Sequence, residues 1–142
     1  MAEVLFRAEL ARAGLAGRVA VSSFGLAAES GVPASEGARN AVAELGADLS
    51  EHRSRRAADV SLGANDVFVG MTPAHVHALK TLPARVFGIA EFFPDGAFPQ
   101  GVPDPFGGSL DDYRAARDAI VSAFPQLIDF LKKTFDGKER AQ

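Results

Sequence analysis

The 142-residue sequence contains no cysteine. This absence excludes disulfide bonds, a thiolate nucleophile and cysteine-ligated metals within these residues. No apolar run approaches the roughly 20 residues that a membrane-spanning helix needs, and Met1–Val4 lacks the charged-then-apolar pattern of a signal segment. The formal net charge of −3 gives no reason to expect nucleic acid as a partner. We therefore expect a cytoplasmic protein that binds neither nucleic acid nor membrane.

The residues that are present have the pattern of one small α/β domain. With 47% hydrophobic residues, the chain can form a single core, so we expect one domain over residues 1–142. Helical spacing, capping residues and glycine stops predict helices over 2–13, 33–45, 72–80 and 109–135. Short apolar runs predict strands over 18–23, 66–70 and 85–88. Because strands alternate with helices, the sequence predicts a small parallel sheet with helices on both faces.

Two features depart from an ordinary α/β pattern. Sheets of this class normally open with a strand, whereas this sequence opens with a helix that no capping residue precedes. Residues 91–109 are rich in proline, glycine and phenylalanine, and they predict one long loop before the last helix. Loops of this length in compact domains are typically functional or disordered. Ser109, three residues before Asp112, is expected to cap the helix that follows.

The most informative segment is Asp104–Ser109, which reads Asp-Pro-Phe-Gly-Gly-Ser. Taken alone, an aspartate before proline in a glycine-rich loop is a common turn signal. In its position before the last helix, the segment resembles the general-acid loop of the low-molecular-weight protein tyrosine phosphatase family. The Phe-Gly-Gly variant resembles the bacterial form, which tyrosine and protein-arginine phosphatases share. Further segments match the family in order along the chain: Met1–Glu3, Ser22–Gly25, Gly31–Pro33, Asp48–Ser50, His52–Arg55, Met71–Thr72, His75 and Tyr113.

The resemblance implies both a fold and a reaction. The fold implied is a three-layer α/β/α arrangement around a small parallel sheet, like that of phosphotyrosine protein phosphatase I, without cofactor or metal. The reaction implied is hydrolysis of phosphotyrosine or phosphoarginine in proteins through a cysteinyl-phosphate intermediate. Asp104 would be the general acid that protonates the leaving group, and Phe106 would line the slot for the phosphorylated side chain. The partner implied is a phosphorylated protein.

Two departures from the family bear on that reaction. Family members begin with a strand and a phosphate-binding loop of the form Cys-x5-Arg, and neither has a counterpart in this sequence. Met1–Glu3 resembles the residues just past that loop. We therefore expect a phosphatase-like domain that is incomplete at its N-terminus, without the first strand, and inactive as these 142 residues alone. Phe24 stands where a small residue is usual, next to the expected loop.

Three interpretations stay open from the sequence. The first is a phosphatase whose sequence is truncated at its N-terminus, which we favour because Asp104 and its loop are intact. The second is a non-catalytic relative that serves as a binding or scaffold protein. The third, a relative of thiol-dependent arsenate reductases, fits less well because that chemistry requires cysteines. The choice between phosphotyrosine and phosphoarginine and the oligomeric state also stay open.

The other polar residues predict neither a metal site nor a phosphate site. His75 and His77 are two apart on a helix, so they would point to different faces and make a poor metal pair. We interpret the basic segment His52–Arg56 as a solvated surface that pairs with nearby acids. Residues 86–113 contain five acidic residues and no lysine or arginine. That region should repel phosphate unless a phosphate loop supplies a positive field.

Overall fold

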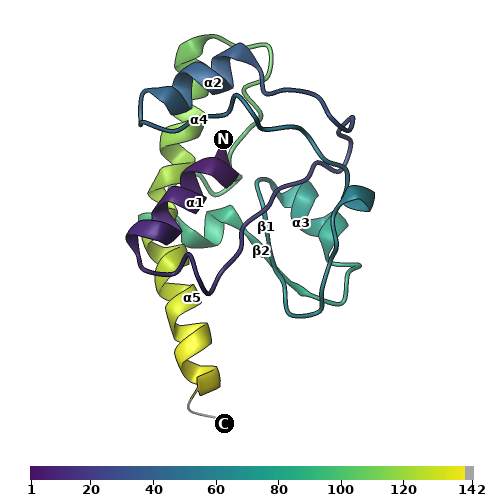
Figure 1. The fold of residues 1–142 in the computed structure, drawn as a ribbon, viewed down its shortest axis with the longest axis vertical. Coiled ribbons are helices and arrows are strands. Elements are labelled where there is room, and N and C mark those ends of the chain that lie inside the picture. Colours follow the sequence, from purple (N-terminus) through teal and green to yellow (C-terminus); the bar gives the residue numbers. More distant parts are fainter. Residues whose placement is uncertain (140–142) are drawn as a thin grey trace.

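The computed structural model of the chain describes residues 1–139, which form helices around a two-stranded sheet (Figure 1). The α-helices are α1 (Ala2–Arg12), α2 (Glu36–Ala43), α3 (Pro73–Leu79), α4 (Leu110–Ser122) and α5 (Phe124–Glu139). The strands are β1 (Val67–Gly70) and β2 (Arg85–Gly88), and short 3₁₀ helices occupy Ala57–Asp59, Ile89–Phe92 and Pro94–Gly96. None of the helices in the described part of the chain has the length and apolarity needed to cross a membrane. The expected α/β class is confirmed.

The two strands run parallel, with Gly70 opposite Gly88 at their ends. Helix α3 connects β1 to β2 and packs against both strands. On the other side of the sheet, the ring of Phe87 in β2 contacts Phe92 and Phe130, with ring centroids 5.9 and 5.0 Å apart. Because Phe130 belongs to α5, helices cover the sheet on both sides, as the alternating pattern predicts. Figure 1 shows α3 on one side of the strands and α1, α4 and α5 on the other.

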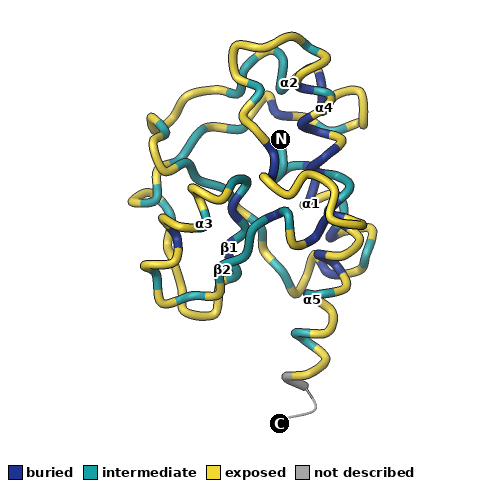
Figure 2. The backbone as a smooth tube through the Cα atoms, turned by 180° about the vertical axis from the view of Figure 1, so that it is seen from behind, coloured by how far each residue is buried: buried dark blue, intermediate teal, exposed yellow. Residues whose placement is uncertain are grey.

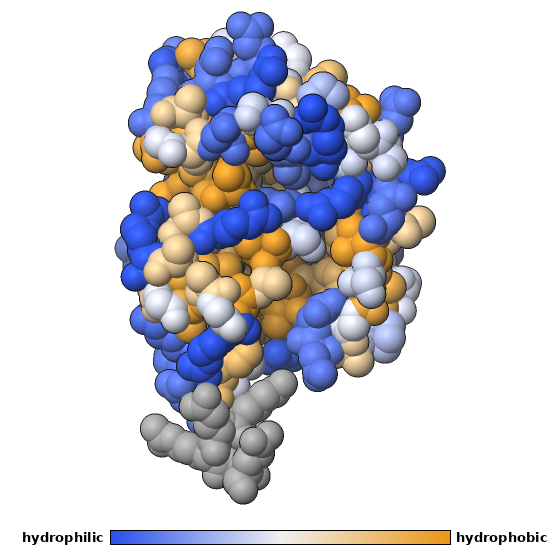
Figure 3. Space-filling view, in the orientation of Figure 1, coloured by the Kyte–Doolittle hydropathy of each residue, from blue (hydrophilic) through white to orange (hydrophobic). Residues whose placement is uncertain are grey.

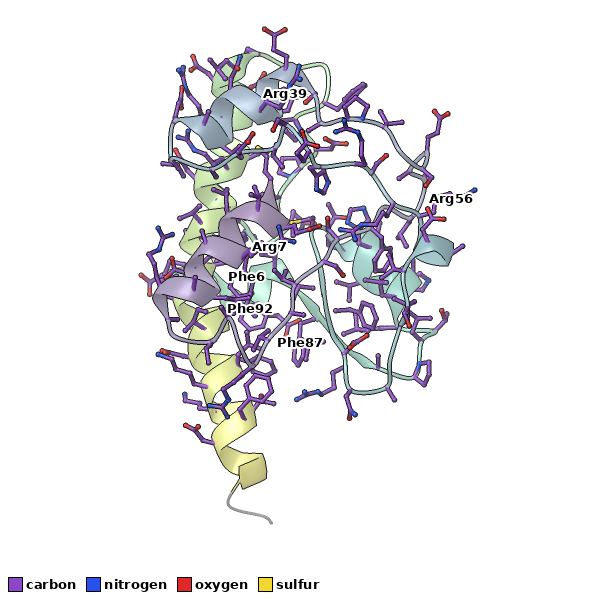
Figure 4. All side chains as sticks on the ribbon, viewed as in Figure 1. Phe6, Arg7, Arg39, Arg56, Phe87 and Phe92 are labelled. Atoms are coloured by element: carbon purple, nitrogen blue, oxygen red, sulfur yellow. The ribbon has the colours of Figure 1, made fainter. Side chains whose placement is uncertain are left out.

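The hydrophobic core lies mainly among α1, α4 and α5, and Figure 2 shows buried segments on these helices. Leu10 of α1 is only 1% exposed. The ring of Phe6 in α1 packs against Phe124 of α5, with 5.0 Å between ring centroids. Phe6, Phe92 and Phe87 belong to this core and follow one another from α1 towards β2 in Figure 4. This packing fixes α1 relative to the last two helices.

The strand expected over residues 18–23 does not form, so this prediction is wrong. Among the described residues, no backbone hydrogen bond joins residues 19–23 to β1. Just beyond this segment, Gly25 forms an isolated parallel bridge with Arg56. A strand requires a ladder of hydrogen bonds to a neighbouring strand, and an apolar run without such a neighbour stays irregular. The sheet therefore has two strands in this structure, where the sequence predicts three.

Two expected helices have different limits from those predicted. The second helix begins at Glu36 rather than near Pro33, because Ser35 caps it by accepting a hydrogen bond from a backbone N–H of the first turn at 3.3 Å. The last expected helix divides at Ala123 into α4 and α5. Pro125 has no N–H to donate to a carbonyl of the preceding turn, so the helical bonding pattern is interrupted there.

The segment predicted to be one long loop, residues 91–109, has local structure of its own, because 3₁₀ helices occupy part of it. The Val102 N–H donates to the Met71 carbonyl at 2.8 Å, which ties the segment to the end of β1. Asp95 and Phe98 have φ angles of 54° and 51°. Such angles are uncommon outside glycine and costly for a bulky side chain. The loop is therefore ordered by short 3₁₀ helices and by a backbone contact with the end of β1.

Candidate active site

The segment Asp104–Ser109, called the acid loop below, folds into two consecutive turns. The Phe106 N–H donates to Asp104 Oδ1 at 3.0 Å, which is a turn that aspartate side chains commonly form. The Gly108 N–H then donates to a carbonyl three residues back at 2.8 Å, and Gly107 has a φ angle of 77°. Glycine suits this angle because it has no Cβ to clash. The turn that the sequence signals is therefore confirmed.

A capping box joins the acid loop to α4. The Ser109 N–H donates to Asp112 Oδ2 at 2.7 Å, and the Asp112 N–H donates to Ser109 Oγ at 3.2 Å. The bonds from the Ser109 N–H and hydroxyl hold the pKa of Asp112 below its usual value, so this carboxylate is charged near neutral pH. A Cβ at Gly108 would lie 2.6 Å from Asp112 Oδ2, so a larger residue would disturb the cap. The expected cap is confirmed, and it fixes the loop relative to α4.

The two residues that the family resemblance indicates, Asp104 and Phe106, are adjacent in the structure and both exposed. Phe106 is 81% exposed, the highest value among the large hydrophobic residues of the described chain. Asp104 is exposed as well, and within residues 1–139 only its Oδ1 atom takes part in a hydrogen bond. Its Oδ2 atom accepts no hydrogen bond from these residues.

A buried carboxylate, that of Glu3, lies in the first turn of α1 and is 6% exposed. Ser23 Oγ donates to its Oε2 atom at 2.6 Å, and Arg55 Nη2 donates to the same atom at 2.9 Å. Arg7 Nη2 donates to Oε1 at 2.5 Å, and His52 Nδ1 lies 4.0 Å from Oε2. We call these five side chains the Glu3 cluster. It joins α1 to two segments that are distant in sequence.

The charges within the Glu3 cluster set the protonation states of its acid and its histidine. Burial raises the pKa of Glu3, but hydrogen bonds from Ser23 and Arg7 and the charge of Arg55 outweigh burial, so the net pKa lies below the usual value. Burial lowers the pKa of His52, although the Glu3 charge opposes this shift. Sequence reasoning missed this cluster; the available signal was the four-residue spacing of Glu3 and Arg7 on one helix face. Figure 4 shows Arg7 on α1 facing the centre of the molecule.

Arg55 and Arg56 of the basic segment His52–Arg56 pair with acids, as the sequence predicts, whereas Arg53 donates to backbone carbonyls. Arg56 Nη2 lies 3.4 Å from Asp59 Oδ1, and Figure 4 shows Arg56 at the edge of the molecule. The sequence predicts that these arginines pair with acids at the solvated surface. Arg55 does not fit this prediction, because its partner Glu3 is buried. Since the partner is buried, this pair is screened less by water and salt than a surface pair would be.

The two histidines of α3 are exposed. His75 donates its backbone N–H to Thr72 Oγ1 at 3.4 Å, which is the cap expected for this helix. His77 is also exposed. Among the described residues, no group of three or more histidine, cysteine, aspartate or glutamate side chains is arranged to hold a metal ion.

A cavity of about 300 Å³ opens at the carboxyl ends of β1 and β2, where ligands commonly bind in parallel sheets. Lys80, His77 and Glu91 contribute polar groups to its lining. The Gly88 N–H donates to Glu91 Oε1 at 2.8 Å, so part of that carboxylate is already engaged. Asp104 and Phe106 are not among the lining residues, so this cavity and the acid loop are separate features.

Comparisons with known proteins identify relatives over nearly the whole chain. The family model described as "Low molecular weight phosphotyrosine protein phosphatase" matches residues 1–137. A protein-arginine-phosphatase of Bacillus subtilis (strain 168) is 32% identical over 137 residues, which cover 94% of this chain and 88% of that protein. The match therefore spans the acid loop as well as α1.

Two solved structures with 28–31% sequence identity share the fold of this chain. A YwlE mutant from Bacillus subtilis matches with a TM-score of 0.76 and 31% identity, covering 93% of this chain and 88% of its own. A low molecular weight protein tyrosine phosphatase from T. tengcongensis matches with a TM-score of 0.74 and 28% identity, covering 90% and 87% of the two chains. The arrangement of helices around the sheet is therefore that of these phosphatases.

Proposed function

Since the chain belongs to the low molecular weight phosphotyrosine protein phosphatase family, we propose that it supplies the general acid of a protein phosphatase, with Asp104 in that role. Members of this family dephosphorylate phosphorylated proteins. The observation that carries the proposal is the exposed Asp104 carboxyl, held at the start of an ordered turn with one oxygen unbound. A general acid needs this combination of fixed position and free oxygen.

The proposed reaction has two displacement steps and uses a cysteine that these 142 residues do not contain. The proposal assigns that cysteine to a Cys-x5-Arg loop ahead of Met1. In the first step its thiolate attacks phosphorus, a P–S bond forms, and the bond to the leaving oxygen or nitrogen breaks while Asp104 donates its proton to the leaving atom. In the second step Asp104 accepts a proton from water, whose oxygen attacks phosphorus. The P–S bond breaks, and inorganic phosphate and the thiolate are released.

The first turn of α1 supports this assignment. No side chain caps the N-terminus of α1, so the first N–H groups of the helix have no side-chain acceptor. Helix N-termini favour anions, because their N–H groups and the helix dipole point towards the ligand. The Glu3 cluster neutralises the only acid in that turn with Arg7 and Arg55. A phosphate loop leading into α1 would thus meet a helix end that is held in position.

Phe106 is proposed to line the slot for the phosphorylated side chain. Its ring is 81% exposed and follows Asp104 by two residues, so a bound side chain could contact the ring beside the acid. An aromatic ring can pack against the ring of phosphotyrosine or against a guanidinium group. The 32% identity to a protein-arginine-phosphatase favours phosphoarginine over phosphotyrosine as the substrate.

A non-catalytic role is the second candidate, and one specific observation favours it. The absence of cysteine leaves these residues without the nucleophile of the family reaction. In this case the domain would be a binding or scaffold protein, and the acid loop would serve only as a turn.

A fusion protein tests the proposal. A strand and a Cys-x5-Arg loop from a family member are joined ahead of Met1, and hydrolysis of phosphotyrosine and phosphoarginine peptides is measured. We expect activity from the fusion and none from residues 1–142 alone. Asp104→Asn in the fusion should slow hydrolysis about 10²–10⁴-fold for poor leaving groups and much less for good ones. The matched control is the fusion with serine in place of its cysteine.

Two results would count against the proposal. A fusion that folds but hydrolyses neither peptide would favour the non-catalytic role. Equal slowing of good and poor leaving groups by Asp104→Asn would assign the residue to the turn rather than to proton transfer.

A further inference from the structure

A groove with a volume of about 350 Å³ lies between the acid loop region and one face of α4. Three alanines and Asp112 form its α4 side: Asp112, Ala115, Ala116 and Ala119. The opposite side comes from the chain before and within the acid loop: Phe98, Gly101, Val102, Pro103, Asp104, Pro105, Phe106 and Gly108. The lining is therefore mostly apolar, with two carboxylates. The groove reaches the proposed general acid, because Asp104 is part of its wall.

The groove holds two aromatic rings that the fold leaves uncovered. Phe98 is 54% exposed and Phe106 is 81% exposed, the two highest values among large hydrophobic residues of the described chain. Phe98 has a φ angle of 51°, which is strained for a bulky residue, and its ring packs edge-on against the buried Phe93 at 5.5 Å. The fold thus holds an aromatic ring at the surface in a costly conformation, which suits a ring that contacts a partner.

The charged groups of the groove are all negative. Asp104 and Asp112 line it, and no lysine, arginine or histidine of the described residues does. The Asp112 cap uses Oδ2, so Oδ1 takes part in no hydrogen bond within the described residues. The nearby cation Arg114 is directed elsewhere, because its guanidinium donates to Glu44 and Asp111. A positively charged ligand would therefore be attracted by the two aspartates, and the Arg114 guanidinium would not compete with it for them.

We propose that this groove binds the side chain of an unphosphorylated arginine in the protein substrate, close to the residue that is dephosphorylated. The identity of the partner as a substrate rests on the proposed function. The aliphatic part of the arginine would lie on the alanines of α4, its guanidinium would stack on Phe98, and Asp112 Oδ1 would accept its N–H groups. Arginine fits better than lysine because a planar guanidinium can stack and form two hydrogen bonds at once.

The test uses peptides without phosphate, so its outcome does not depend on the hydrolysis experiment. An eight-residue peptide with one central arginine is titrated into residues 1–142, and into the fusion protein, while amide chemical shifts are recorded. The matched peptide carries citrulline, which keeps the shape of arginine but not its charge. We expect shifts in the acid loop and the first turns of α4, a dissociation constant on the order of 1 mM, and at least about tenfold weaker binding of the citrulline peptide.

Two substitutions outside the proposed catalytic residues locate the binding. Ala115→Lys puts a positive charge into the groove and should weaken binding about tenfold or more, as should Phe98→Ala through loss of the stacked ring. Ala78→Lys adds the same charge on α3, where Ala78 is exposed, and should leave binding unchanged. The proposal is overturned if citrulline binds equally well, if Ala115→Lys has no effect, or if an acidic peptide binds as tightly. It is also overturned if the groove signals shift with protein concentration alone, which would assign the groove to a second copy of the chain.

Discussion

Glu3→Gln removes the one negative charge of the Glu3 cluster while keeping the side chain's shape, so it isolates the contribution of that charge to folding. The carboxylate accepts hydrogen bonds from Ser23 at 2.6 Å, Arg55 at 2.9 Å and Arg7 at 2.5 Å. A hydrogen bond to a charged group contributes about 1.5–3 kcal/mol. Arg7 and Arg55 are 56% and 37% exposed, so water compensates part of their loss. We expect the free energy of unfolding to fall by about 2–3 kcal/mol, out of the roughly 5–15 kcal/mol typical of a domain.

The pH dependence of this loss follows from the pKa of Glu3. That pKa is lower in the folded chain than the value of about 4.3 expected for an unfolded chain. The contribution of Glu3 is therefore fully present above the unfolded pKa and is lost as pH falls through the folded pKa. Glutamine does not titrate, so the difference between the parent chain and Glu3→Gln should be large at pH 7 and should shrink below about pH 4.5.

The measurement is urea unfolding followed by circular dichroism at pH 7 and pH 3.5. A temperature near 10 °C, where domains are close to maximal stability, keeps the variant within the measurable range. Glu9→Gln is the matched control, since Glu9 lies on the same helix and pairs with Arg12 at the surface. Its effect should stay below about 1 kcal/mol. An unchanged midpoint for Glu3→Gln at pH 7, or an equal loss at both pH values, would refute the assignment of a charged Glu3 to the cluster.

Two further outcomes are expected from the backbone. Gly101→Ala should destabilise the chain by more than about 2 kcal/mol, because Gly101 has a φ angle of 78° and a Cβ there would lie 2.0 Å from the Met71 carbonyl oxygen. The control Gly17→Ala should be tolerated, because no atom lies within 4 Å of a Cβ at that position. Similar unfolding midpoints for the two variants would contradict this prediction. Residues 1–142 should self-associate through β1, which pairs only with β2 among the described residues. Figure 3 shows hydrophobic residues at the surface in the middle of the view, where Figure 1 places the two strands. Size-exclusion chromatography and thermal unfolding test this; a monomer that unfolds cooperatively above about 55 °C would speak against it.

Local chemistry was sufficient to predict those parts of the fold that depend on neighbouring residues. Thr72 and Ser109 cap their helices as the sequence predicts, because a hydroxyl three residues before a backbone N–H can reach it without help from elsewhere. The turn at Asp104 is also local, since it needs only an aspartate, a proline and a glycine in order. The strands β1 and β2 were predictable because their apolar runs are short and bounded, and each has the other as a neighbour.

Tertiary structure decided what depends on distant partners. Residues 18–23 have the composition of a strand, yet a strand forms only where another backbone supplies its hydrogen bonds, and composition does not encode that neighbour. The Glu3 cluster gathers side chains up to 52 positions apart in the sequence, and the groove pairs Phe98 with a face of α4. The sequence alone was thus sufficient to identify the acid loop and the family to which the chain belongs. Only the packing of the folded chain determined which charged side chains lie around α1 and which aromatic rings lie beside α4, because burial and long-range contact are properties of the folded chain.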